Sequence, residues 1–250
     1  MNKTTGWLLT AAALFIVGVK LLLMVVGMWQ SHVEDTGIDQ INQGNKLMKA
    51  GDKASIARAA VLYKHAADIF NKMDNRAERR NEGLAYYDLA RAYAALEQYP
   101  QALDAIENAL PLLDDDQSKA DRADAFGLKA YYLMKSGKPD EALTAYREAE
   151  PLFRSAGKID SAEGMLRVEG AIYYDKAVNA AEKRDWAAAR DLCIKSKDLY
   201  HQARRPGDEA TAAHELSVIY LVLGDSAHST EARSQEQALR AKAPAGSDDN

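Results

Sequence analysis

Apolar and polar residues alternate along this chain with the spacing of amphipathic helices. Apolar residues three and four positions apart, such as Ala102, Ile106 and Ala109, predict helices with one buried stripe. Within this pattern a small residue recurs at spacings of 40 to 47 residues, where one antiparallel helix is expected to touch another. The residues of this first set are Gly44, Ala90, Ala130, Ala177 and Ser217.

Two further sets of small residues keep the same order in each copy. The second set is Ala59, Ala102, Ala142, Ala189 and Ser229, and the third is Ala66, Ala109, Ala149 and Ser196. A fixed order of small and large positions at a period of about 40 residues is typical of a helical repeat array. The pattern predicts helix pairs over residues 37–73, 79–114, 119–156, 160–203 and 207–240.

The copies resemble the tetratricopeptide repeat family, which has a W-x2-L-G-x2-Y signature, a glycine between helices A and B, and an A-x3-F core. The segments that carry the resemblance are Gly44-x2-Leu47-x3-Gly51, Ala90-x2-Tyr93, Ala142-x3-Tyr146-x2-Ala149 and Leu216-Ser217-x2-Tyr220-x3-Gly224. The resemblance covers about residues 36–240. It implies an all-α, right-handed solenoid of about five helix pairs over 37–240, which binds proteins and is not an enzyme.

The chain departs from the family pattern at several positions. Glu97 and Arg184 stand at turn positions that favour glycine. Arg233 and Glu236 stand at core positions of the fifth copy, which therefore resembles the polar terminal cap that such arrays need for solubility.

The N-terminal segment differs from the repeats because it is almost wholly apolar. Between Trp7 and Trp29 only Thr10 and Lys20 are polar, and a helix of this length would cross a ~30 Å hydrocarbon core. A cleaved signal peptide is the alternative, but no A-x-A site follows the run. We therefore predict a transmembrane signal anchor over 1–30, with the bilayer contacted by 5–30, and a short acidic linker over 31–36.

Flanking charges predict the orientation of this anchor. Lys3 precedes the apolar run, whereas Glu34 and Asp35 follow it. Because positive charge is retained in the cytoplasm, we expect an inner-membrane, single-pass protein with its repeats on the periplasmic or extracytoplasmic side. Lys20 would either extend to the interface or contact another membrane helix.

Charge and residue types narrow the classes of function. The net charge of −5 argues against a nucleic-acid partner, and Cys193 is the single cysteine, so no intramolecular disulfide forms. His214-Glu215 begins like a zinc-protease motif but lacks its second histidine. We therefore expect no catalytic residues, no metal and no cofactor. The tail over 241–250 carries Pro244 and acidic residues and is predicted to be disordered.

In the family the inner groove is lined mainly by the A helices, and the register of the small residues implies which side chains face it. The predicted groove residues are Tyr87, Arg91, Tyr131, Met134, Tyr174 and His214. Residues at related positions are Asn45, Met48, Lys49, Lys135, Val178, Val218, Leu221 and Val222. Tyrosine and arginine are favoured at protein interfaces, and methionine gives an adaptable surface. The alternative is that some of these tyrosines pack between A helices.

The sequence thus favours a membrane-anchored scaffold or assembly factor that captures a protein or peptide client. Two alternatives remain open: an accessory subunit of a larger membrane complex that docks through its membrane helix and Lys20, and a regulatory scaffold that faces the cytoplasm.

Overall fold

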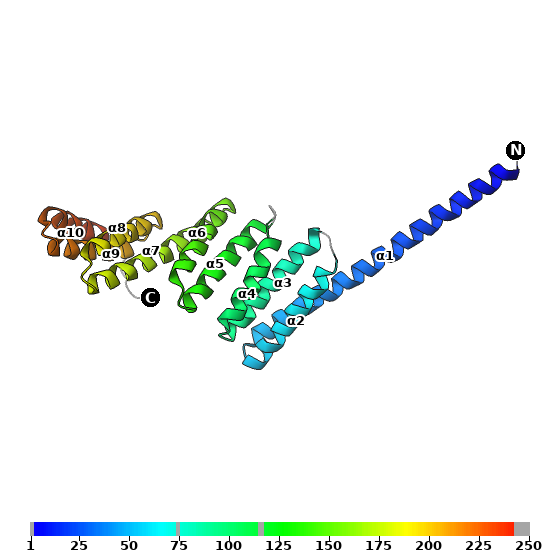
Figure 1. Ribbon diagram of the computed structural model, residues 1–250, viewed down its shortest axis with the longest axis horizontal. Helices are drawn as coiled ribbons and strands as arrows, with labels where there is room; N and C mark the ends of the chain where they lie inside the picture. Colours follow the sequence, from blue (N-terminus) through cyan, green and yellow to red (C-terminus); the bar gives the residue numbers. More distant parts are fainter. Residues whose placement is uncertain (1–2, 74–75, 115–117, 243–250) are drawn as a thin grey trace. The chain divides into compact units, whose positions relative to one another are not determined.

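The protein is described by a computed structural model that covers residues 3–73, 76–114 and 118–242, with the side chains of 3–17, 29–30 and 76–77 left aside. Every regular element in these ranges is helical (Figure 1). The helices form two compact units, Met1–Leu113 and Asp114–Asn250. Each unit is a stack of antiparallel helix pairs, so the predicted helical repeat array is confirmed within each of them.

The first unit holds two helix pairs, and the second holds three. In each pair we call the first helix the A helix and the second the B helix. The A helices of the first unit are α1 (Lys3–Ala50) and α3 (Arg76–Ala95), and its B helices are α2 (Lys53–Asn71) and α4 (Tyr99–Ala109), followed by the short 3-10 helix η1 (Leu110–Leu112). The A helices of the second unit are α5 (Lys119–Lys135), α7 (Ile159–Glu182) and α9 (Pro206–Val222), and its B helices are α6 (Pro139–Ser155), α8 (Trp186–Gln202) and α10 (Ser226–Arg240).

Local sequence signals explain where the B helices begin. The side chains of Asp52, Asp185 and Asp225 each accept a hydrogen bond from the backbone N–H three residues later, which satisfies one donor that the first helical turn leaves open. Pro139 stands at the start of α6, where proline loses no helical hydrogen bond.

The turns between A and B helices share one backbone conformation. Gly51, Gly137 and Gly224 have φ of 78°, 73° and 80°, in the left-handed region that glycine enters without steric cost. Glu97 and Arg184, the predicted departures, adopt the same conformation with φ of 61° and 62°. The turn geometry is therefore kept even where the glycine is missing.

The predicted small residues lie in the core, as the repeat register requires. All residues of the first, second and third sets are buried. Gly44 lies against the ring of Tyr63, and a Cβ added to it would stand 2.7 Å from Tyr63 Cε1. Because the helices approach this closely, large side chains cannot occupy these positions.

The predicted linker is helical. α1 continues without a break through residues 31–36, and Gly37, which follows them, is buried against Phe70 of α2. The acidic residues of the predicted linker lie along α1, whose C-terminal part packs on α2. Of the predicted tail over 241–250, residues 241 and 242 form a turn, and residues 243–250 lie outside the described residues.

The predicted membrane location is overturned. Among the described residues no helix is both long enough and apolar enough to cross a membrane. The expected inner-membrane, single-pass location is therefore wrong. The roles predicted for Lys20 and for a bilayer partner depended on it, and Lys20 is an exposed side chain of α1.

Candidate protein-interaction surfaces

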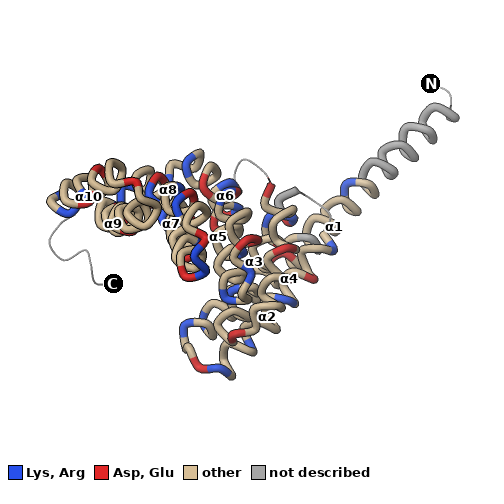
Figure 2. The backbone as a smooth tube through the Cα atoms, turned by 60° about the vertical axis from the view of Figure 1, so that its left-hand side comes forward, with Lys and Arg blue, Asp and Glu red and all other residues tan. Residues whose placement is uncertain are grey.

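Lys and Arg residues and Asp and Glu residues are both distributed along the helices of each unit (Figure 2). On a surface that is charged in this way, large exposed apolar side chains mark candidate contact sites. Exposed apolar side chains on these repeats therefore stand out as candidate contact points.

In the first unit, the predicted groove residues Tyr87 and Arg91 lie on α3 and interact with their own helix. The Arg91 guanidinium donates to Asp88 Oδ1 at 3.2 Å and lies 5.9 Å above the Tyr87 ring. Burial raises the pKa of Asp88, and the charge of Arg91 opposes this shift. Nearby, the Tyr63 hydroxyl of α2 donates to Asn45 Oδ1 of α1 at 2.7 Å. This surface is polar, and its groups already have partners.

In the second unit, Tyr131 and Met134 lie on α5, and Tyr131 is the most accessible of the predicted tyrosines. Its residue is 45% exposed, its ring centre lies 5.9 Å from that of Tyr132 in a T-shaped arrangement, and Lys135 Nζ lies 5.5 Å from the centre of the Tyr131 ring. Met134 is half-buried beside it. Tyr131 is held by its neighbours but offers a free face.

Tyr174 and His214 offer less free surface than Tyr131. Tyr174 of α7 is half-buried and packs against the core formed by α7, α8, α9 and α10; burial, and then the charge of Glu215, raises its pKa. His214 of α9 is exposed, but its Nδ1 lies 3.0 Å from Glu236 Oε2 of α10. Tyr174 thus contributes mainly to packing, which is the alternative that the sequence left open for the tyrosines.

The C-terminal half of α9 exposes a row of aliphatic side chains. Val218, Leu221 and Val222 occupy the same positions on α9 that Tyr131, Met134 and Lys135 occupy on α5. Leu221 is 60% exposed and Val222 is 50% exposed. Since aliphatic residues in an A helix are normally covered, this exposure marks α9 as a candidate contact helix.

A cationic cluster, which sequence reasoning missed, joins α6, α7 and α8. Arg147 of α6 donates to Glu169 Oε1 at 2.7 Å and to the Tyr173 hydroxyl at 2.5 Å, while Lys195 Nζ of α8 lies 4.3 Å from the Tyr173 ring centre. Burial acts to raise the pKa of Tyr173, but hydrogen bonds from Lys195 and Arg147 outweigh it and lower this pKa. Because Glu169 is buried, the cluster serves first to fix these helices together. Its members are too far apart in the sequence for a local motif to show it.

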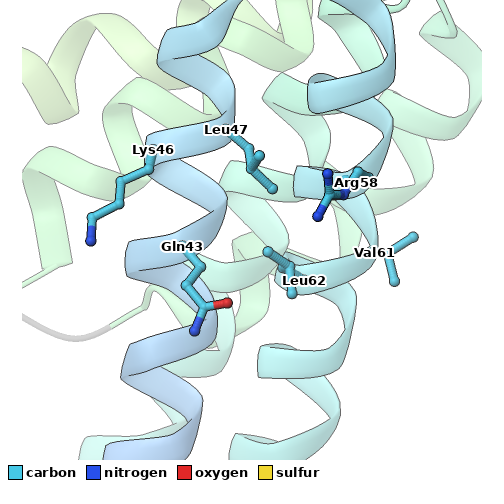
Figure 3. A pocket seen from close by; sticks show the side chains of 6 residues that line it. All are labelled: Gln43, Lys46, Leu47, Arg58, Val61 and Leu62. Carbon is cyan, nitrogen blue, oxygen red and sulfur yellow. The ribbon is translucent and has the colours of Figure 1, made fainter.

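A pocket of about 440 Å³ opens between α1 and α2. Leu47 of α1 and Leu62 of α2 point into the space between the two helices, and Lys46 and Val61 stand at its two sides (Figure 3). Gln43 and Arg58 complete the lining. Val61 is 69% exposed, more than any other large apolar side chain among the described residues.

Groups that could carry chemistry are sparse on this scaffold. Among the residues that the structure describes, no three His, Cys, Asp or Glu side chains are placed to hold a metal ion. The Cys193 thiol is fully buried and donates to the carbonyl oxygen of Ala212 at 3.3 Å. The exposed apolar residues are therefore the features that remain to be explained.

No family model matches this chain, and no curated protein matches it by sequence. Solved structures that are similar to it include proteins described as having TPR or TPR-like repeats. One, a putative kinesin light chain with nearly identical TPR-like repeats from Podosopora anserina, has a TM-score of 0.49 and 18% identity, covering 80% of this chain and 94% of that one. YrrB, described as a TPR protein with an unusual peptide-binding site, has a TM-score of 0.48 and 21% identity, covering 83% and 88%.

A third similar structure, MamA, has a TM-score of 0.48 and 15% identity, covering 83% of this chain and 93% of that one. These likenesses concern the fold alone. The helix pairs, the buried small residues and the shared A–B turns of this structure are those that the resemblance of the sequence to the tetratricopeptide repeat fold implied, whereas the membrane-anchored type that was expected is not shown.

Proposed function

We propose that this chain is a protein-binding scaffold whose second unit captures an apolar client segment on its A helices. The observation that carries this proposal is the exposure of apolar side chains on the A helices α5 and α9: Tyr131 and Val218 are exposed at equivalent repeat positions, and Leu221 and Val222 are exposed one turn further along α9. The fold keeps these side chains uncovered although the same helices bury their other apolar faces.

The chemistry of these residues suits capture of a protein segment. A tyrosine or leucine that becomes buried at an interface gains about 25 cal/mol for each Å² of apolar surface removed from water. Tyr131 is already oriented by Tyr132 and Lys135, so it would lose little side-chain freedom on binding. Lys135 lies beside this anchor and would favour a client with an acidic residue next to its apolar contact.

The proposal is tested by site-specific photocrosslinking in cells of the source organism. A photoreactive phenylalanine analogue replaces Tyr131 in one variant and Glu148 in the control, because Glu148 is exposed on the B helix α6. We expect the Tyr131 position to crosslink to a defined protein and the Glu148 position to give no such product. The double change Tyr131→Ala and Leu221→Ser should abolish recovery of that protein, while circular dichroism stays unchanged.

Tyr174 is left intact in this experiment because it packs against the core, so its truncation would mix loss of stability with loss of binding. The matched control is the double change Thr144→Ala and Glu148→Ala on the exposed face of α6. Equal crosslinking from positions 131 and 148, or full recovery by the folded Tyr131 and Leu221 variant, would refute the proposed surface.

A further inference from the structure

The pocket between α1 and α2 of the first helix pair is open to solvent. Its apolar floor is formed by Leu47 and Leu62, and Val61 extends this floor along α2. An apolar floor of this kind is unfavourable in water unless another group covers it.

The pocket lies on the face of α2 that points away from α3. Tyr63 of α2 lies near Asp88 and Arg91 of α3, whose charges affect its pKa. At about 100° per residue, Val61 and Arg58 lie about 160° and 140° around the helix from Tyr63. α3 packs against both α1 and α2. The pocket therefore lies on the side of the α1–α2 pair opposite to α3, where a second helix could pack against the same two helices.

The polar lining of the pocket carries one sign of charge. Lys46 and Arg58 flank the floor, Gln43 is neutral, and no carboxylate lines the pocket. Among the described residues, neither Lys46 nor Arg58 forms an ion pair. Two cations beside an apolar floor attract an anionic partner and repel a cationic one.

A second copy of this chain does not suit this pocket. A two-fold contact through the same face would bring the cationic lining of one copy, Lys46 and Arg58, against the same cationic lining of the other, and like charges at an interface are unfavourable. A bare anion does not suit it either, because it would leave Leu47, Leu62 and Val61 exposed to water.

We propose that the α1–α2 pocket binds an acidic amphipathic helix of a partner protein. The apolar stripe of that helix would cover Leu47, Leu62 and Val61, and glutamate or aspartate on its flanks would pair with Lys46 and Arg58. Recognition of an amphipathic helix in a groove is read through apolar anchors about one turn apart. This surface belongs to the first unit and is independent of the client surface proposed for the second.

The test uses the full chain and two synthetic helical peptides that share one leucine stripe. The acidic probe carries glutamate on both flanks of the stripe, and the basic probe carries lysine at the same positions. Binding is measured by fluorescence anisotropy at low and high salt. We expect the acidic probe to bind at least about tenfold more tightly than the basic probe at low salt, with this preference reduced by added salt.

Charge reversal supplies the decisive comparison. The double change Lys46→Glu and Arg58→Glu should lower the affinity for the acidic probe at least about tenfold and raise the affinity for the basic probe. The control Lys64→Glu changes an exposed residue of α2 that does not line the pocket, and it should leave both affinities unchanged. Val61→Ser should weaken both probes, and circular dichroism checks that each variant keeps its helices.

The two proposals fail separately. The Tyr131→Ala and Leu221→Ser variant should bind the acidic probe like the unchanged chain, because those residues lie in the second unit. Equal affinity for the two probes, or no effect of charge reversal at residues 46 and 58, would overturn the α1–α2 proposal. If the Tyr131→Ala and Leu221→Ser variant no longer bound the acidic probe, this would also overturn the proposal, because the probe would then bind to the second unit.

Discussion

The hydroxyl of Ser229 in α10 donates a hydrogen bond to the backbone carbonyl oxygen of Ser217 in α9, at an oxygen–oxygen distance of 2.8 Å. Both residues are buried, and they are the small positions of the fifth helix pair that alanine or glycine occupies in earlier copies. The last pair thus keeps the close helix contact of the array and adds a polar link, which suits a terminal pair with few buried apolar residues on α10.

Loss of this link should destabilise the last helix pair. Ser229→Ala removes the donor and should lower the free energy of unfolding by about 0.5–1.5 kcal/mol. Ser229→Leu should cost more, about 1–3 kcal/mol, because the added atoms overpack the contact with Ser217. Urea unfolding followed by circular dichroism measures both. Ser234→Ala, an exposed change on the same helix, is the control and should be neutral or slightly stabilising; equal effects of the two alanine changes would contradict the role of Ser229.

Two glycines inside helices should respond oppositely to the same substitution. Gly44→Ala places a Cβ 2.7 Å from Tyr63 Cε1, so we expect a loss of about 1–3 kcal/mol in unfolding free energy. Gly164→Ala in α7 meets no atom within 4 Å and should gain about 0.5–1 kcal/mol, since alanine favours the helix. Thermal unfolding of the two variants gives the comparison, and a stabilising Gly44→Ala would mean that α1 and α2 are farther apart than described.

The repeat register is the part of the fold that the sequence specifies most fully. A small residue at a helix contact is a local requirement that any larger side chain would violate, so Ala90, Ala130 and Ala177 mark the contacts directly. The conformation of the turns is less evident from the sequence, because Glu97 and Arg184 adopt positive φ although they are not glycine. There the hydrogen bonds of the turn, such as Asp185 N–H to the carbonyl of Ala180, maintain the conformation.

The candidate sites were less predictable, because exposure depends on the neighbouring helices and not on residue type. Tyr131 and Tyr174 were both predicted to line a groove, yet Tyr174 packs against the core while Tyr131 stays exposed. Val61 lies within a helix that reads as amphipathic, and nothing local shows that its side would be uncovered. The link from Arg147 to Glu169 joins two helices and requires the tertiary fold.

Glycine should relieve the strained turn between α7 and α8. Arg184 has φ of 62°, a region that costs an L-residue about 1–2 kcal/mol and costs glycine little. Because glycine also loses about 0.5–1 kcal/mol of chain entropy, Arg184→Gly should raise the free energy of unfolding by up to about 1 kcal/mol. The reverse change, Gly137→Ala at φ of 73°, should lower it. If chemical denaturation finds Arg184→Gly less stable than the unchanged chain, a contact of the arginine side chain outweighs the backbone strain.

The buried thiol of Cys193 should report on opening of the second unit. Burial raises the pKa of Cys193 from 9.0 to about 12, so the reactive thiolate is scarce at neutral pH in the folded chain. We expect an aromatic disulfide reagent to modify Cys193 at a rate limited by unfolding, and to react rapidly with the chain in urea. In a Ser136→Cys, Cys193→Ala variant the single thiol lies in an exposed turn and should react rapidly without urea.

The same raised pKa gives Cys193 a pH-dependent contribution to stability. The unfolded thiol ionises near its ordinary pKa of 9.0, whereas the folded thiol stays neutral until about 12. The contribution is therefore complete below pH 9 and is lost as the pH rises toward 12, because the unfolded state gives up its proton first. The difference in unfolding free energy between the unchanged chain and Cys193→Ala should be constant from pH 6 to 8 and should shrink above pH 9. A constant difference up to pH 10.5, or rapid native modification of Cys193 at pH 7, would show that the thiol is not held in the neutral form by the packing of α8 against α9.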